Sequence, residues 1–235
     1  MYSFESRIRY SEVDFHKKLT LAGIANYFQD CSTFQSEDLG LGIEALAELN
    51  RAWLLNSWQI VVNRTPFLGE KVTVGTWAYD FKGFYGYRNF IMMDEAGEIC
   101  AVANSLWVYV DTDTGHPARI PQEAAKPYGC EPRYPMEYAD RKVSVPKEPA
   151  SHPSFCVVSA NIDTNNHVNN GQYILMAEEY LPEGFEVREL RVEYRNAARL
   201  GDTIYPKVCC EDRLCTVILE DVDGKIYAIL AFTGK

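Results

Sequence analysis

The two halves of the chain repeat one pattern of residues. In the first half Asp14 precedes the apolar stretch at residues 19–28, and in the second half Asp163 precedes the stretch at residues 167–174. A leucine–glycine–acid segment then follows in each half, at residues 68–70 and 200–202. Self-similarity on this scale indicates two copies of one supersecondary unit rather than a solenoid of short repeats. The sequence therefore predicts a tandem of two related units.

Each half also has the same order of predicted elements: a strand, a polar turn, a helix and then several long strands. The second-half helix can be capped by Asn169 or Asn170, and its apolar stripe begins at Tyr173. Pro182 is expected to end it. The long strands, rich in β-branched and aromatic residues, are predicted at residues 57–62, 71–79, 87–93, 99–110, 187–194, 203–210, 215–220 and 226–233. A helix followed by an antiparallel meander, twice, predicts an α+β fold: a tandem (double) hot-dog in which each half is a long helix wrapped by an antiparallel sheet.

The domain limits follow from a change in composition. Residues 123–150 are rich in Pro, Lys and Glu and lack a clear period, which is typical of a linker. We therefore expect an N-terminal hot-dog domain at residues 1–122 and a C-terminal one at residues 151–235. The first half also contains an insertion, in which residues 42–49 predict a short amphipathic helix.

Charge and cysteine content limit the function classes. The formal net charge of −10 argues against a nucleic-acid partner, which would require a basic face. The seven cysteines are odd in number and lack framework spacing, which indicates a reducing compartment, and the adjacent Cys209 and Cys210 are expected to be ordinary strand residues. No apolar run is long enough to span a bilayer, and the N-terminal residues do not form a signal-peptide core. We expect a cytoplasmic protein.

Only the second half carries a dense polar cluster, at residues 163–170 just before the predicted helix. Asp163 could act as a general base or nucleophile, Asn165 could fix a carbonyl or a water, and His167 could transfer a proton near neutral pH. A helix N-terminus presents unpaired N–H groups that suit a developing oxyanion, here at Asn169, Asn170 and Gly171. The alternative for each residue alone is structural, because Asp and Asn are common in turns and caps.

The other residues that could contribute to a binding site indicate a function less clearly than the polar cluster does. All the tryptophans lie in the first half: Trp53, Trp58, Trp77 and Trp107. Core packing is their ordinary role, although they would also suit the walls of a site that binds an acyl chain. No histidines have metal-ligand spacing and no glycine-rich phosphate loop is present, so neither a metal nor a cofactor is expected.

The polar cluster belongs to a longer motif. It reads Asp163-x-Asn165-x-His167-Val168-Asn169-Asn170-x-x-Tyr173-Ile174, with Glu193-Tyr194-Arg195 after the helix. In this motif, and in first-half segments at residues 61–66, 69–72, 76–77, 97–98 and 105–108, the chain resembles the fatty acyl-ACP thioesterases of plants and bacteria, where ACP is acyl-carrier protein. The resemblance implies a tandem hot-dog whose N-terminal half holds the acyl chain. It also implies catalytic roles for Asp163, Asn165 and His167 in the C-terminal half.

The chain departs from the family pattern at one point. After the Tyr-Arg pair the family has a basic residue, a glutamate and then a cysteine or small residue, whereas this chain has Asn196, Ala197 and Ala198. The departure does not support a Cys–His–Asn mechanism. It favours hydrolysis by water built on Asp163, with Asn165 and His167 orienting the water and the thioester.

The resemblance implies a thiolester hydrolase of fatty acid biosynthesis that cleaves fatty acyl-ACP. Hydrolysis of acyl-CoA at the same site is one alternative, and a non-catalytic acyl-binding or carrier-docking protein, favoured by Ala197 and Ala198, is another. The chain could also form a homodimer. Because ACP and this chain are both acidic, docking would need a local basic patch. Candidates are Arg191, Arg195 and Arg199, or in the first half Arg64, Lys71, Lys82 and Arg88.

Overall fold

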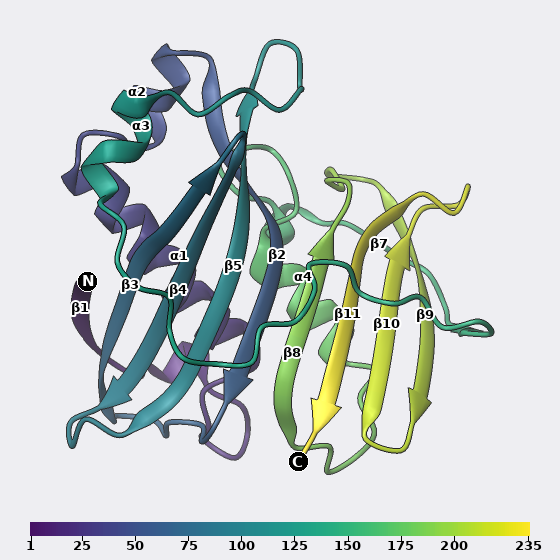
Figure 1. Ribbon diagram of the computed structural model, residues 1–235. Helices are drawn as coiled ribbons and strands as arrows, with labels where there is room; N and C mark the ends of the chain where they lie inside the picture. The colour runs from purple at the N-terminus through teal and green to yellow at the C-terminus, as the bar shows by residue number, and fades with distance from the viewer. The chain divides into compact units, whose positions relative to one another are not determined.

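The computed structural model describes residues 1–235 as two compact units (Figure 1). The first unit contains residues 1–56 and 60–139, and the second contains residues 57–59 and 140–235. The main boundary therefore falls inside the stretch predicted as a linker. None of the helices combines the length and the apolar character needed to cross a membrane.

The first unit is an antiparallel sheet with one long helix, α1 (Leu21–Asp38). The strands follow the order β1-β3-β4-β5-β2, with bounds β1 (Tyr2–Arg7), β2 (Arg51–Val62), β3 (Lys71–Lys82), β4 (Tyr85–Asp94) and β5 (Ile99–Asp111). Short helices complete the unit: η1 (Tyr10–Glu12), α2 (Ile43–Glu48), α3 (Gln122–Ala125) and η2 (Lys126–Tyr128). The predicted insertion helix at residues 42–49 is confirmed as α2.

The sheet of the first unit has an inner face toward α1 and an outer face away from it. On the inner face Phe28 of α1 contacts Phe90 of β4, with ring centroids 5.3 Å apart. Side chains alternate between faces along a strand, so the neighbouring positions point outward. There Trp77, Ile91 and Val102 form a buried cluster, and Tyr134 and Met136 pack against it.

The stretch predicted as a linker therefore covers this outer face. Its anchor is Asn89 of β4, whose fully buried side chain accepts hydrogen bonds from the Tyr134 N–H at 2.9 Å and the Tyr138 hydroxyl at 3.0 Å. The Trp77 indole donates to the Pro132 carbonyl at 3.0 Å. These bonds give polar groups of an irregular segment defined partners, which is what allows it to pack on a sheet.

The second unit repeats the arrangement with a shorter helix, α4 (Asn170–Glu178). Its sheet follows the order β8-β11-β10-β9-β6, with β7 pairing to β9. The bounds are β6 (Ala150–Ser151), β7 (Phe155–Cys156), η3 (Ser159–Asn161), β8 (Val187–Tyr194), β9 (Thr203–Glu211), β10 (Leu214–Glu220) and β11 (Ile226–Gly234). The helix ends at Glu178, before the predicted stop at Pro182, and two turn residues fill part of the gap.

Residues 140–143 pack on the second unit much as residues 131–138 pack on the first. Val143 joins a buried cluster with Ile218 and Ile229. The Val143 N–H donates to the Glu193 carboxylate at 2.9 Å, and the Arg191 guanidinium donates to the Lys142 carbonyl at 2.7 Å. The stretch between the units is therefore bound to each sheet separately.

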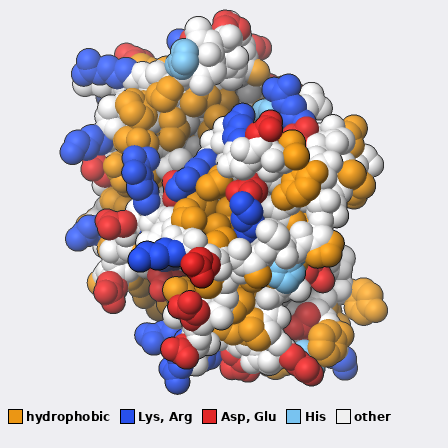
Figure 2. Space-filling view, turned by 90° about the vertical axis from the view of Figure 1, so that its right-hand side faces the viewer, with side chains coloured by type: hydrophobic (Ala, Val, Ile, Leu, Met, Phe, Trp, Pro, Cys, Tyr) orange, Lys and Arg blue, Asp and Glu red, His pale blue; other side chains and the backbone are white.

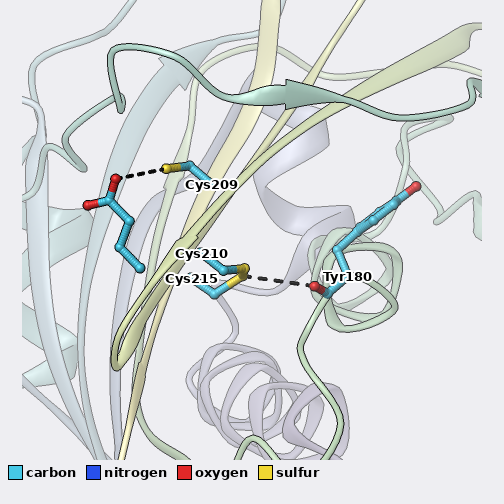
Figure 3. Close-up of a disulfide and its surroundings, with 5 residues drawn as sticks. Tyr180, Cys209, Cys210 and Cys215 are labelled. Carbon is cyan, nitrogen blue, oxygen red and sulfur yellow. Dashed lines mark hydrogen bonds between the residues drawn. A yellow bond between two sulfur atoms is a disulfide. The ribbon is translucent and has the colours of Figure 1, made fainter.

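Cysteine pairing differs from the sequence prediction. Cys210 and Cys215 form a disulfide between β9 and β10 (Figure 3). The reason is register: Cys210 lies directly opposite Cys215 in the antiparallel pair, whereas successive residues of a strand point to opposite faces. Cys209 is a free thiol beside Glu211, and Cys215 contacts the Tyr180 carbonyl in the turn that follows α4. The prediction that Cys210 is an ordinary strand residue was wrong.

Candidate functional site

The predicted catalytic residues lie on a tight loop between η3 and α4. The loop is closed by an isolated antiparallel bridge between Ile162 and Val168. Within it the Asp163 N–H donates to the His167 carbonyl at 2.8 Å, and Asn166 adopts a positive φ of 57°, which asparagine tolerates better than most residues. The polar composition of the cluster thus fits a reversal of the chain just before the helix.

Asp163 has a structural task in this loop. Its Oδ1 atom accepts hydrogen bonds from the main-chain N–H groups of Asn165 at 2.8 Å and His167 at 3.5 Å. Its Oδ2 atom takes part in neither bond, and the side chain is half-buried. One carboxylate oxygen therefore holds the turn, and the other is left to accept a proton.

The side chains of Asn165 and His167 flank this carboxylate without bonding to it. The Asn165 side chain is exposed and His167 is half-buried. No hydrogen bond joins the side chains of Asp163, Asn165 and His167 to one another. Separate donors and acceptors on one loop can act on a bound water and a carbonyl, but they do not form a relay of the serine-protease type.

The N-terminus of α4 is already capped. The Asn169 side chain accepts the Gly171 N–H at 2.8 Å, which is the usual role of asparagine at an N-cap. The Asn170 carbonyl accepts the Tyr194 hydroxyl at 2.9 Å. The Gly171 N–H, one of the predicted oxyanion donors, is thus engaged by the cap.

Ala198, where the family pattern places cysteine or a small residue, lies next to the loop that carries Asp163, Asn165 and His167. Its carbonyl accepts the Val168 N–H at 2.9 Å, and its N–H donates to the Tyr173 hydroxyl at 2.8 Å. Ala198 is fully buried. Burial of the Tyr173 side chain raises its own pKa to about 12, so the phenol stays neutral. The loop after β8 is therefore fixed to α4 and to the residue that follows His167.

The first unit contains the same loop with different side chains. The Asp14 N–H donates to the Lys18 carbonyl at 2.8 Å, and the Asp14 Oδ1 atom accepts the N–H groups of His16 and Lys18 at 2.9 Å each. Lys17 has a positive φ of 64°, and Val13 bridges to Leu19. Asp14 and Asp163 are thus equivalent braces, and what differs between the loops is the side chains carried after them.

Sequence reasoning did not assign a role to Tyr173 and Tyr194, although the repeat contained a signal for Tyr173. In the first unit the Leu19 N–H donates to the Pro66 carbonyl, as Val168 does to Ala198. Pro66 has no N–H to offer, and the helix position equivalent to Tyr173 is Ile24, which has no hydroxyl. The second unit therefore has both the N–H donor at residue 198 and the hydroxyl acceptor at residue 173, and the first unit has neither at the equivalent residues.

The four tryptophans do not share one surface. Trp53 lies beside Tyr109, with ring centroids 4.9 Å apart, and next to Gly86. Trp107 donates to Ser105 on the same strand. Trp77 belongs to the outer face covered by residues 131–138, and Trp58 is buried in the part of β2 assigned to the second unit. A role in binding an acyl chain therefore remains a prediction, with Trp53 and Trp107 as the better placed of the four.

Most of the predicted docking cations already have partners. Arg64 pairs with Glu70 and Asp94, Lys71 pairs with Glu95, and Arg195 pairs with Glu193. Arg191 is bound to main-chain carbonyls, and Arg88 is buried. Lys82 and Arg199 are exposed and form no ion pair. On the face drawn in Figure 2, basic side chains lie beside exposed hydrophobic ones, with acidic side chains interspersed.

No set of three or more His, Cys, Asp or Glu side chains is placed to hold a metal ion. The candidate site is thus a loop that offers one carboxylate oxygen, one imidazole and one amide beside a helix N-terminus.

Comparison with known families decides the identity. The model of the acyl-ACP thioesterase N-terminal domain matches residues 1–128, and the model of the C-terminal domain of the same enzymes matches residues 145–223. The chain belongs to the acyl-ACP thioesterase family. Solved structures share the fold: an acyl-ACP thioesterase from Bacteroides thetaiotaomicron superposes with a TM-score of 0.90 at 23% identity, covering 99% of this chain and 97% of that one.

A 12:0-ACP thioesterase from Umbellularia californica superposes with a TM-score of 0.86 at 18% identity, covering 100% of this chain and 96% of that one. These likenesses confirm the predicted α+β tandem hot-dog fold.

Curated relatives of this acyl-ACP thioesterase family member are longer proteins. The oleoyl-acyl carrier protein thioesterase 2 of Arabidopsis thaliana is 27% identical over 218 residues, or 84% of this chain and 59% of that protein. The palmitoyl-acyl carrier protein thioesterase of Gossypium hirsutum is 28% identical over 214 residues, or 83% of this chain and 51% of that protein. This chain thus spans between about half and three fifths of the length of these relatives.

Proposed function

We propose that this chain hydrolyses fatty acyl-ACP to a free fatty acid and the carrier protein. The observation that carries the proposal is the match of both family domains, together with the loop of Asp163, Asn165 and His167 at the N-terminus of α4. In the reaction a water oxygen forms a bond to the thioester carbonyl carbon, the carbon–sulfur bond breaks, and the water proton passes to the departing thiolate.

Each loop residue has a task in this scheme. The free oxygen of Asp163 accepts the water proton while the other oxygen holds the turn. His167 donates a proton to the leaving sulfur, and the proton taken up by Asp163 later returns to His167 through water, so that the net transfer is from the attacking water to the thiolate. The Asn165 amide orients the carbonyl or the water. The partial positive charge at the start of α4 favours the oxyanion. The Ala198–Tyr173 hydrogen bond supports the loop, because the Ala198 carbonyl in turn binds the Val168 N–H next to His167.

The experiment is release of thiol from purified acyl-ACP, measured over a series of chain lengths. We expect turnover with acyl-ACP and loss of most of it in His167→Ala. Acyl-CoA substrates of the same lengths separate the two carriers, since a docking surface for ACP should lower KM only for the protein-bound substrate. Equal kcat/KM for both carriers would favour the acyl-CoA alternative.

A non-catalytic acyl-binding protein is the second candidate. It is favoured by Ala197 and Ala198 at the family's Glu and Cys positions, and by the turn-holding role that Asp163 shares with Asp14. Acyl-ACP bound to the protein without thiol release would support it. A cytoplasmic location and a homodimer remain predictions from the sequence, and the two plant relatives are both named as chloroplastic.

A further inference from the structure

One buried cation of the first unit has no part in the proposed chemistry. Arg88 of β4 is only 7% exposed, on the sheet face toward α1. It forms no ion pair: its Nη2 donates to the Gln35 side-chain oxygen of α1, and its buried Nε has no hydrogen-bond partner. A guanidinium carries five N–H donors and is rarely buried without a carboxylate. This arrangement leaves donor capacity unused inside the unit.

The surroundings of Arg88 are aromatic and polar rather than acidic. The guanidinium carbon lies 5.3 Å from the ring centroid of Tyr128 and 6.0 Å from that of Phe90. The Tyr128 hydroxyl and Ser36 on α1 are 2.9 Å apart. Burial lowers the pKa of Arg88 to about 10, with Tyr128 acting in the opposite direction, so the side chain is still charged at neutral pH. The neighbours hold the cation but do not neutralise it.

The repeat shows that the fold itself does not require this charge. Met93 of β4 and Glu220 of β10 precede equivalent turns, and each stands at a register shift, so the two positions correspond in the repeat. Arg88 and Cys215 each lie five residues before them and are therefore equivalent as well. Cys215 is fully buried and forms a disulfide. The equivalent position in the sheet of the second unit is therefore filled without a cation.

We propose that Arg88 and Gln35 form a binding site for a hydrogen-bond acceptor oxygen carried by the acyl chain, at a carbon away from the thioester. The ligand class is an oxygenated acyl chain, bearing a hydroxyl or a carboxylate, and the free Nε–H is the donor that receives it. The inference rests on the proposed function in so far as the first unit holds the acyl chain. A charge-assisted hydrogen bond contributes enough to change affinity by about 10- to 100-fold.

The test compares plain, ω-hydroxy and ω-carboxy acyl-ACP of equal length. We measure kcat/KM for the wild type, for Arg88→Met, and for Arg133→Met, a matched change at an exposed arginine that stacks on Tyr138. Arg88→Met should lower kcat/KM for an oxygenated chain by about 10- to 100-fold relative to the plain chain, and Arg133→Met should change no ratio. A larger loss for the carboxylate than for the hydroxyl identifies charge neutralisation as the main contribution.

Binding of fatty acid methyl esters to the wild-type protein, measured by titration calorimetry, needs neither a stable variant nor hydrolysis, and esterification removes the carboxylate that a plain fatty acid would itself offer to Arg88. Binding of the ω-hydroxy or ω-carboxy ester at least about tenfold tighter than the plain ester supports the site. Any smaller preference for both oxygenated esters overturns it. If no acyl-ACP is hydrolysed at all, the proposed function fails, and the calorimetry still decides whether Arg88 binds an oxygen.

Discussion

At the scale of single residues, Asp163 has one observed purpose, holding the loop, and one proposed purpose, accepting a proton. Its Oδ1 atom holds the loop through two main-chain N–H groups, and only Oδ2 is left for chemistry. An alanine substitution alone cannot separate these purposes, because it removes the brace together with the base. Asparagine keeps an oxygen that can accept the two N–H groups while it removes the charge and the basicity.

We therefore predict that Asp163→Asn lowers kcat by about 10²-fold or more, the usual scale for removal of a general base, with little change in stability. Turnover of acyl-ACP and the midpoint of urea unfolding are measured together. Asp14→Asn, in the equivalent loop of the first unit, is the matched control and should leave kcat unchanged. Near-normal turnover in Asp163→Asn would remove this residue from the mechanism.

A second prediction concerns the thiols. The disulfide removes Cys210 and Cys215, and burial raises the pKa of Cys31 to about 12 and that of Cys100 to about 11, so few of these thiols are ionised near neutral pH. Alkylation of the native protein should therefore modify the exposed Cys130 and Cys156 first and leave most activity intact. Loss of activity in step with modification of one cysteine, mapped by mass spectrometry, would contradict a mechanism that uses water.

At the scale of elements, the contact between α4 and the loop after β8 decides how the site is held. The Tyr173 hydroxyl is the acceptor for the buried Ala198 N–H. Tyr173→Phe should cost about 1–3 kcal/mol of stability, because it leaves a buried donor without a partner, and it should also lower kcat through the displaced loop. Tyr194→Phe, which removes a donor to the Asn170 carbonyl, is the comparison. A loss below about 0.5 kcal/mol with unchanged kcat in Tyr173→Phe would show that water replaces the hydroxyl.

The strands and the helices could be predicted well, and the contacts between them could not. Alternation and helical spacing are local, so β8 has the predicted bounds and most other strands differ by a few residues. The predicted loop residues are brought together because they are neighbours in the chain. In contrast, the Cys210–Cys215 disulfide depends on strand register, and the docking of residues 131–138 depends on long-range contacts such as those of the buried Asn89 amide. Neither feature has a periodic signal.

The two faces of the first sheet give a test of where the acyl chain lies. Trp53 lies next to Gly86 and Tyr109, whereas Trp77 lies on the outer face under residues 131–138. Trp53→Phe should shift the released fatty acids toward longer chains, by several-fold for each methylene since one buried CH₂ contributes about 0.8 kcal/mol. Trp77→Phe should leave the product profile unchanged. The reverse pattern, read from product analysis by gas chromatography, would place the chain elsewhere.

At the scale of the whole molecule, charge limits how an acidic partner can approach. The net charge is −10, and most basic candidates are neutralised by local ion pairs, which leaves Arg199 and Lys82 exposed. Two negative proteins repel at long range unless a local patch attracts.

We predict that Arg199→Glu or Lys82→Glu raises KM for acyl-ACP several-fold at low salt without changing KM for a small acyl thioester. The effect should shrink as salt is added, because screening weakens surface charge. Lys225→Glu, another exposed cation, serves as the control for net charge. If neither reversal separates the two substrates, the carrier docks through another surface.

The equivalence of the Asp14 and Asp163 loops also bears on how such a chain can change over time. In a dimer of identical subunits every substitution is made twice, so a residue that harms one copy of a loop harms the other as well. In a fused pair each substitution is made once. One loop could then acquire Phe15, Lys17 and Lys18 while the other kept asparagine and histidine around the same aspartate brace. A tandem chain is thus free of that symmetry, and its two loops can share one aspartate brace while they carry different side chains.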